Sequence, residues 1–453
     1  MEESSSLSQG NSITDGVIWK QLLTFFFPIL FGTFFQQLYN TVDAIIVGQF
    51  VGKEALAAVG GSTSVLINLL VNLFVGISSG TTVVVAQKYG ARKLEELSQA
   101  VHTSFALALV GGLVLGAIGF LAAPFALEAM GTPADVMDGA LTYMRVIFLG
   151  TIASCIYNIG SGVLRAVGDT KRPLYFLMAS CLTNIVLDLL LVVQFKMGVL
   201  GVALATVISQ VVSAVLAILA LVQEGVVYQL DFHKIRFTPS ILRSVLNVGL
   251  PAGLQSDMYA ISNIIIQSCI NSFGTDTVAA WTAFGKIDGF FWMVMGAFGV
   301  SITTFVSQNY GAMKYDRVKK SIKVCLGMAF LFTVVVSTFF LVFANPLYHL
   351  FTSDANVLEL GLMMMRYMAP FYWTYIFVEI LSGAIRGTGN ALTPMLLTCG
   401  GICVMRVLWI IFILPLRREM TTVIYSYPIS WAFTSVLFIV YYLRGNWLKT
   451  KAQ

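Results

Sequence analysis

The sequence predicts an all-α protein that crosses a membrane twelve times and consists of two related halves. Three observations lead to this prediction: an apolar composition, apolar runs long enough to cross a bilayer, and a set of motifs that occurs twice in the same order. Of the 453 residues, 57% are hydrophobic and 11% are charged, whereas about a quarter of the residues in a soluble domain are charged. So few polar groups cannot cover a folded surface, and lipid must therefore be part of the solvent.

Apolar runs separated by polar breaks mark the expected spans. A helix needs about 20 apolar residues to cross a bilayer, and the runs predict twelve such helices. They are expected at residues 18–47, 56–86, 99–122, 138–160, 174–195, 199–222, 242–271, 278–309, 323–343, 358–382, 394–415 and 423–444. The first and seventh are longer than a bilayer requires, and Pro28 and Pro251 are their expected bend points.

Basic residues are distributed unevenly over the loops between these spans. With the N-terminus inside, most loop lysines and arginines, Arg386 among them, lie on the cytoplasmic side. The opposite side holds Lys53, Lys196, Arg417 and Arg418. Because basic loops remain in the cytoplasm, a multi-pass protein with both termini cytoplasmic is predicted.

The spans divide the chain into two lobes with short flanking segments. Residues 1–16 are rich in serine and carry acid where a cleavable signal peptide would be basic, so they are predicted to form a disordered cytoplasmic arm. The lobes are expected at 17–222 and 242–444, with a cytoplasmic linker at 223–241 between them and a cytoplasmic tail at 445–453. The six cysteines include no CxxC pair and are interpreted as packing residues.

An internal repeat relates the two lobes. The matched motifs are AQKYGA (86–91) with SQNYGA (307–312), and GVLRAVGDTKRP (162–173) with GAIRGTGNALTP (383–394). Their offset of 221 residues also separates Arg145 from Arg366. Six helices per copy give both lobes the same topology, and parallel repeats of this kind place a site near the midplane that opens to each side in turn. A duplicated channel or scaffold without such alternation is the simpler alternative.

The first predicted span carries a polar stripe. Gln36, Asn40 and Asp43 follow the spacing i, i+4, i+7 and therefore lie on one helix face. An ionised group at bilayer depth costs about 2.5–3.5 kcal/mol on insertion scales and is a functional candidate by default. The stripe must face a polar interior, and Gln36 and Asn40 are expected to line a substrate cavity.

Three further polar residues of the first lobe accompany Asp43. Asn184 and Asp188 lie one turn apart on the fifth span, and Thr206 lies on the sixth. Together with Asp43 they supply hard oxygen ligands, which suit Na⁺, or a carboxylate pair that carries H⁺. The competing interpretation is a buried hydrogen-bond network that only holds helices together.

The second lobe has a different set of polar and aromatic residues. Its expected cavity residues are Gln255, Tyr259, Asp288, Trp292 and Met295. Its remaining intramembrane charges, Asp257, Lys286 and Glu379, form a candidate second charge site. Trp292 and Met295 share the face of Asp288 and are either core residues or an adaptable apolar wall for flat organic cations. Lys286 is either part of that site or a structural partner that neutralises one of the acids.

In its motifs the sequence resembles the multidrug and toxic compound extrusion (MATE) family, and most of all its prokaryotic DinF-like branch. The resemblance rests on NTVDAIIVG, AQKYGA, LRAVGDT, NIVLDL, SQNYGA and IRGTGN in this order. It implies two six-helix bundles around a V-shaped central cavity, in the cell membrane of a prokaryote. It also implies export of amphipathic, often cationic drugs against an inward H⁺ or Na⁺ gradient, with Asp43, Asn184, Asp188 and Thr206 as the cation-coupling residues.

Other classes of function are less well supported by the sequence. There is no HExxH or Walker A motif, so no enzyme is predicted. No cofactor other than the coupling ion and no nucleic-acid partner is expected, and the protein is expected to work as a monomer in contact with membrane lipid. A lipid-linked oligosaccharide flippase of the same superfamily is the nearest alternative, although it would need a basic cavity. A passive channel is the next alternative.

Overall fold

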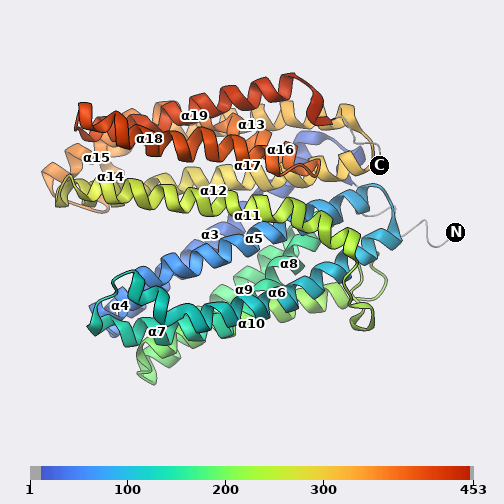
Figure 1. Cartoon of the computed structure of the whole chain (residues 1–453), viewed down its shortest axis with the longest axis horizontal. Coiled ribbons are helices and arrows are strands. Elements are labelled where there is room, and N and C mark those ends of the chain that lie inside the picture. The colour runs from blue at the N-terminus through green and yellow to red at the C-terminus, as the bar shows by residue number, and fades with distance from the viewer. Residues whose placement is uncertain (1–11, 449–453) are drawn as a thin grey trace. The chain divides into compact units, whose positions relative to one another are not determined.

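A computed structural model describes residues 12–448, which form helices and no strand (Figure 1). The predicted all-α fold is confirmed. The helices of the first half are α2 (Ser12–Asp15), α3 (Ile18–Phe50), α4 (Lys53–Gly60), α5 (Ser62–Gly90), α6 (Leu94–Ala129), α7 (Ala134–Leu149), α8 (Thr151–Val167), α9 (Lys171–Asp188) with the π-helical turn η1 (Leu189–Gln194), and α10 (Gly198–Val222).

The second half repeats this series after a short connecting segment. Its helices are η2 (Phe232–Lys234), α11 (Pro239–Asn271), α12 (Thr275–Gly311), α13 (Tyr315–Val342), α14 (Ala344–His349), α15 (Ala355–Met368), η3 (Ala369–Phe371), α16 (Tyr372–Gly387), α17 (Leu392–Thr398), η4 (Cys399–Val404), α18 (Met405–Phe412), η5 (Leu414–Leu416), α19 (Met420–Leu443) and η6 (Asn446–Leu448).

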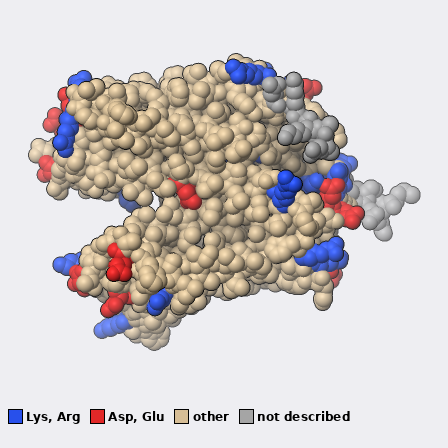
Figure 2. All heavy atoms as spheres, in the orientation of Figure 1, with Lys and Arg blue, Asp and Glu red and all other residues tan. Residues whose placement is uncertain are grey.

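Each of the twelve predicted spans corresponds to a helix or to a broken helix. Over the described residues, 10 helices are long and apolar enough to cross a membrane, and 11 if the pair α7 and α8, bent by 47°, counts as one span. The helix outside this count is α11, which is 33 residues long. Figure 2 shows acidic and basic side chains mainly at the ends of the helices, as expected of a multi-pass membrane protein.

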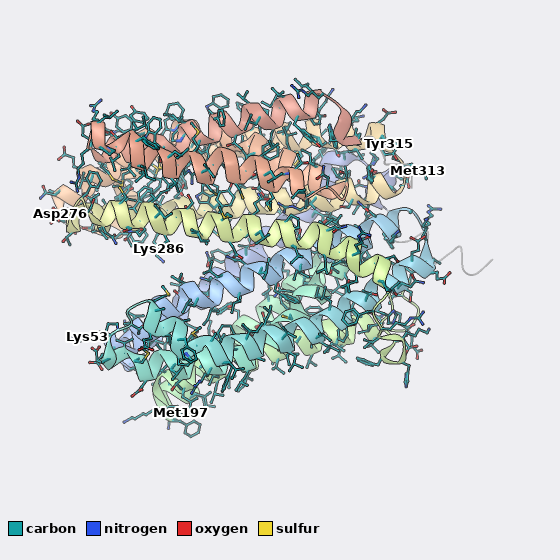
Figure 3. All side chains as sticks on the ribbon, viewed as in Figure 1. Lys53, Met197, Asp276, Lys286, Met313 and Tyr315 are labelled. Carbon is teal, nitrogen blue, oxygen red and sulfur yellow. The ribbon has the colours of Figure 1, made fainter. Side chains whose placement is uncertain are left out.

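The ends of the helices agree with the predicted alternation of sides. Lys53 and Met197 lie at the same end of the first-half helices, and Asp276 and Met313 lie at opposite ends of α12 (Figure 3). Part of the predicted N-terminal arm is helical, because α2 covers Ser12–Asp15. Ile13 and Thr14 of α2 are buried, so these residues of the expected arm are not disordered, while residues 1–11 and 449–453 lie outside the described residues.

The chain forms two compact units whose boundaries differ from the predicted lobes. Unit 1 contains residues 12–15 and Phe27–Gly253, and unit 2 contains Gly16–Phe26 and residues 254–448. The change of unit occurs inside α3 and inside α11, not in the linker at 223–241. Each change lies within three residues of a proline, Pro28 or Pro251, where the helix lacks one backbone hydrogen bond and bends most easily.

Close helix packing explains why the first half of α11 belongs to unit 1. A Cβ on Gly76 of α5 would lie 2.2 Å from the backbone nitrogen of Gly253, and one on Gly80 would lie 2.3 Å from the carbonyl oxygen of Val245. Only glycine permits this backbone contact. The two GxxxG sequences, at 76–80 and 249–253, pack small residues at a helix interface as membrane helices commonly do.

In unit 2 the first turns of α3 are held by side chains. The ring of Phe26 lies 4.3 Å from that of Phe298 and 5.2 Å from that of Phe332. Arg317 of α13 donates hydrogen bonds to the carbonyl oxygen of Gly16, at 2.7 Å, and to Oε1 of Gln21, at 2.9 Å. The helices α3 and α11 each pass from one unit to the other. The first half of α11 is held in unit 1 by backbone contact, and the first turns of α3 are held in unit 2 by aromatic and polar side chains.

Candidate functional site

Unit 1 brings the four predicted cation-coupling residues together. Asp43 comes from α3, Asn184 and Asp188 from α9, and Thr206 from α10, and α9 packs along α10 (Figure 1). Asn184 and Asp188 are completely buried, and Asp43 is 6% exposed. Both lie beside the Asp43 carboxylate. The Thr206 hydroxyl lies 3.5 Å from Oδ2 of Asp43 and 3.0 Å from the carbonyl oxygen of Val202, so these two acceptors share its single hydrogen.

This cluster has an excess of acceptors. Neither carboxylate oxygen of Asp188, nor Oδ1 of Asp43, nor either amide atom of Asn184 has a hydrogen-bond partner among the described residues. Buried polar groups are nearly always satisfied, and two facing carboxylates cannot satisfy each other because both only accept. A proton shared between the carboxylates would supply a donor. A hard cation would instead use the same oxygens as ligands.

The backbone changes form directly after Asp188. There α9 ends and the chain continues as the π-helical turn η1, in which the amide of Phe195 donates to the carbonyl of Leu190 at 2.9 Å. Such turns insert one extra residue into a helix and are frequent at functional sites. Nothing in the residue pattern of the fifth span indicated this turn.

A cavity of about 400 Å³ inside unit 1 opens onto the cluster, a volume within the range of small-molecule sites. The predicted cavity residues Gln36 and Asn40 line it, as do Asp43 and Thr206. The carboxamides of Asn68, Asn158 and Gln210 and the rings of Tyr39 and Tyr143 also line it. Among the described residues of its wall, Asp43 is the only carboxylate, and none is a lysine, arginine or histidine.

Most residues that line this cavity were not predicted from the sequence. Tyr39 precedes Asn40 by one position, but it lies off the i, i+4 stripe by which Asn40 was found. Asn68, Tyr143, Asn158 and Gln210 come from four other helices. A single polar side chain on an apolar helix gives no pattern, so only the packing of the helices identifies these residues.

In unit 2 the expected cavity residues are distributed over two clusters. Asp288 is 7% exposed and accepts hydrogen bonds from the hydroxyl of Tyr372 and from Nε1 of Trp292. Phe291 stacks on Tyr372 at 4.1 Å. The ring of Trp431, completely buried, lies 5.9 Å from that of Trp292. Asp288 is thus enclosed by aromatic rings, and Met295, also buried, lies on the same helix.

The second cluster of unit 2 contains Gln255 and Glu379. Gln255 accepts a hydrogen bond from Arg386 at 3.2 Å, so this arginine is engaged by a buried side chain although it was expected in a cytoplasmic loop. The hydroxyl of Tyr375 donates to Glu379 at 3.0 Å. A Cβ on Gly299 would lie 2.0 Å from Oε1 of Glu379, so the carboxylate occupies the space that this glycine leaves.

The structure does not bring the candidate second charge site together. Lys286 is exposed on α12 (Figure 3) and forms no ion pair with an acid among residues 12–448, so it does not neutralise Asp288 or Glu379. Asp257 and Tyr259 are half-buried, and Oδ1 of Asp257 has no hydrogen-bond partner among the described residues. Asp257, Lys286 and Glu379 come from three different helices, α11, α12 and α16, and whether such residues meet depends on how each helix is rotated against its neighbours.

A buried arginine completes the interior of unit 2. Arg406 is 3% exposed, its Nε donates to the hydroxyl of Ser430 at 3.0 Å, and its guanidinium lies 4.1 Å from the ring centre of Tyr427. A cation can be stabilised on an aromatic face in this way. Unit 2 therefore holds charges of both signs in its interior, whereas the cavity wall of unit 1 carries one acid.

Sequence comparison shows that the chain is similar to proteins of one transporter family. A sequence model of the MatE family matches residues 28–190 and 251–412, one match in each half of the repeat. The probable multidrug resistance protein YoeA of Bacillus subtilis is 28% identical over 446 residues, which cover 95% of both chains. The probable multidrug resistance protein NorM of Thermotoga maritima is 25% identical over 438 residues, covering 95% of this chain and 94% of its own.

A solved structure has the same fold. It is described as the outward-facing conformation of a multidrug resistance MATE family transporter of the MOP superfamily, and it is 24% identical in sequence. The TM-score is 0.90, and the match covers 97% of this chain and 98% of the other. At this identity the similarity establishes the two-lobe fold.

Proposed function

The chain belongs to the MatE family of membrane transporters, and from this premise we propose that it is a secondary active multidrug efflux antiporter. It exports amphipathic, cationic organic compounds in exchange for H⁺ or Na⁺ by alternating access. It works as a monomer in the cell membrane of a prokaryote with both termini in the cytoplasm. The relatives named as multidrug resistance proteins support this proposal.

One observation carries the choice of substrate: the charge of the cavity in unit 1. Its wall combines a single carboxylate, Asp43, with five carboxamides and no basic side chain. A cationic group is attracted to such a wall, while the amides and tyrosines offer both donors and acceptors to the rest of the molecule. The apolar part of the wall suits the hydrophobic body of an amphipathic compound.

The same carboxylate serves the coupling ion. Asp43 lines the cavity, and it also faces the buried Asp188, whose oxygens have no partner among the described residues. An ion bound between the two carboxylates removes the charge that a cationic drug needs. Drug and ion therefore compete, and by linkage each weakens the binding of the other by the same factor.

The path of α3 connects ion binding to movement. The helix leaves unit 2 at Phe26, passes Pro28 in unit 1 and carries Asp43 further along the same helix. Binding of an ion at Asp43 changes the forces on this helix, and the proline provides the place where it can bend. Alternating access then follows from a change in the helix that belongs to both units.

The alternative transport functions fit the cavity less well. A flippase for lipid-linked oligosaccharides must hold a pyrophosphate, which requires basic side chains, and no basic residue lies among those that line the cavity of unit 1. A passive channel would not need a buried carboxylate pair in which three of the four oxygens have no hydrogen-bond partner among the described residues. A steady current through a reconstituted bilayer would decide for the channel.

The test is dye efflux from vesicles that contain the purified protein, with proton and sodium gradients imposed separately. Asp43→Asn and Asp188→Asn are compared with the wild type, and Glu419→Gln, in an exposed loop, is the matched control for loss of a carboxylate. We expect one gradient to drive efflux by the wild type and the control, and neither to drive it in the two aspartate variants. Gradient-driven efflux by Asp43→Asn at the wild-type rate would refute the mechanism.

A further inference from the structure

The segment that leads from α10 to α11 is fastened to the beginning of α6 by a buried histidine. His102 is 3% exposed. Its Nδ1 lies 2.6 Å from the carbonyl oxygen of Ser98 and 3.3 Å from the hydroxyl oxygen of the same residue, and its Nε2 lies 3.0 Å from the backbone nitrogen of Asp231. The imidazole thus connects the helix to the backbone of the linker, and all of these residues belong to unit 1.

Two of these contacts fix the protonation state of the ring. A carbonyl oxygen can only accept, so Nδ1 must carry the hydrogen, and a backbone N–H can only donate, so Nε2 must be the acceptor. A neutral imidazole has one donor and one acceptor and satisfies both partners. A protonated imidazole carries hydrogens on both nitrogens, and its Nε2–H would then oppose the N–H of Asp231. The contact with the linker exists only when His102 is neutral.

The neighbouring contacts of the linker do not depend on pH in this way. The hydroxyl of Thr103 donates to the carbonyl of Arg236 at 3.2 Å and accepts from the amide of Thr238 at 3.1 Å. The ring of Phe232 packs edge-on against Phe105 at 6.3 Å. Of these contacts between α6 and the linker, the one made by His102 is therefore the one that depends on the protonation of a side chain.

A proton can reach His102 through a cavity of about 480 Å³ beside the linker. The other charged or titratable groups that line it are Asp231, His233 and Lys234, all from the linker. The carboxylate of Asp231 accepts from the amide of His233 at 3.0 Å, and it lies 3.3 Å from Nδ1 of His233 and 3.5 Å from Nζ of Lys234. The hydrogen bond from the His233 amide lowers the pKa of Asp231, so this carboxylate stays ionised in the range where imidazoles titrate.

The contact between His102 and the linker affects α11, because the linker leads directly into this helix. The first half of α11 lies backbone to backbone against α5, and its second half belongs to unit 2. We propose that His102 is a pH-sensitive latch, which holds the linker to α6 when neutral and releases it when the cytoplasm becomes acidic. Release loosens the anchor of a helix that crosses from one unit to the other.

Hydrogen exchange of the linker amides in the full-length protein tests the latch without requiring transport. Protection factors, corrected for the intrinsic exchange rate, are measured from about pH 8 to about pH 5, the range in which histidines change charge. In the wild type we expect the protection of the Asp231 amide to fall with decreasing pH by roughly five-fold, the factor that corresponds to about 1 kcal/mol and one hydrogen bond.

Three variants distinguish this latch from a general effect of pH. His102→Gln keeps a neutral side chain with an acceptor, and its Asp231 protection should not change with pH. Thr103→Val should lower protection of the Thr238 amide at every pH and leave the pH dependence at Asp231 in place. His233→Gln removes the second imidazole of this cavity, whose Nδ1 lies 3.3 Å from Oδ1 of Asp231, and the pH dependence at the Asp231 amide should remain in this variant. A flat wild-type profile, or an unchanged slope in His102→Gln, would overturn the proposal.

Discussion

The hydroxyl oxygen of Thr206 lies 3.5 Å from Oδ2 of Asp43 on α3 and 3.0 Å from the carbonyl oxygen of Val202, one turn earlier on α10. It joins α10 to α3, while the opposite oxygen of Asp43 has no partner among the described residues. The threonine therefore orients a carboxylate that is otherwise short of donors, and its role can be tested apart from that of the acid.

Thr206→Val, which preserves the shape of the side chain, is expected to weaken binding of the coupling ion. The lost oxygen would be a ligand for Na⁺ and orients the carboxylate. Because its contact with Asp43 is long and its hydrogen is shared with the carbonyl of Val202, the lower end of the range for a hydrogen bond to a charged group applies, about 1.5 kcal/mol, or roughly ten-fold in affinity. The measurement is the dependence of dye efflux on ion concentration. Thr206→Ser, which keeps the hydroxyl, should stay within a few-fold of wild type, and equal affinities for both variants would contradict this role.

Gly76→Ala is expected to destabilise the protein. The new methyl group would lie 2.2 Å from the backbone nitrogen of Gly253, and because that neighbour is backbone, α5 and α11 must move apart. Overpacking of this kind costs about 1–3 kcal/mol, which thermal unfolding in detergent would reveal as a lower midpoint. Gly285→Ala on α12, where a Cβ meets nothing within 4 Å, is the control, and it should leave the midpoint unchanged or raise it.

Tyr372→Phe should also lower stability, for a different reason. The hydroxyl of Tyr372 donates to the buried carboxylate of Asp288. Without this hydroxyl, Trp292 is the remaining side-chain donor to that carboxylate among the described residues. An unsatisfied buried acceptor costs about 1–3 kcal/mol. The matched control is Tyr425→Phe, since Tyr425 is exposed. If both tyrosine variants unfold at the same temperature, the hydrogen bond to Asp288 contributes nothing to stability.

A loop outside the spans offers a test of pH dependence. Nε of Arg417 lies 3.0 Å from Oε2 of Glu419, and this contact, with a smaller contribution from Thr421, lowers the pKa of Glu419. A lowered folded-state pKa means that the pair stabilises the fold above the ordinary pKa of glutamate, about 4.3. That stabilisation is lost as the pH falls through the lowered value.

Arg417→Gln should therefore raise the pKa of Glu419 towards its ordinary value, as followed by the carboxyl carbon shift in an NMR titration. Because the pair is exposed, salt should reduce the difference between wild type and variant. A Glu419 pKa that is the same in both proteins would show that the arginine is not the cause of the shift.

Local patterns in the sequence predicted the repeat, and each predicted span corresponds to a helix or to a broken helix. Apolar runs separate cleanly from polar breaks, because the cost of placing polar groups in lipid acts on each segment by itself. The same local reasoning found the stripe of Gln36, Asn40 and Asp43, since residues one turn apart share a helix face. It could not find the break at Gly150 between α7 and α8 or the π-helical turn η1, which depend on neighbouring helices.

The sequence by itself thus determined that this is a membrane protein of two homologous helical halves, and it identified the acids that lipid would not tolerate. The tertiary structure decided which of these groups meet. It brings Asp43 to Asp188 and Thr206, engages Arg386 with Gln255, and leaves Lys286 exposed. The physical reason is that contacts between helices depend on how each helix rotates and packs against its neighbours, and this is set by all the side chains of the interface together. The crossing of α3 and α11 between the two units has the same origin.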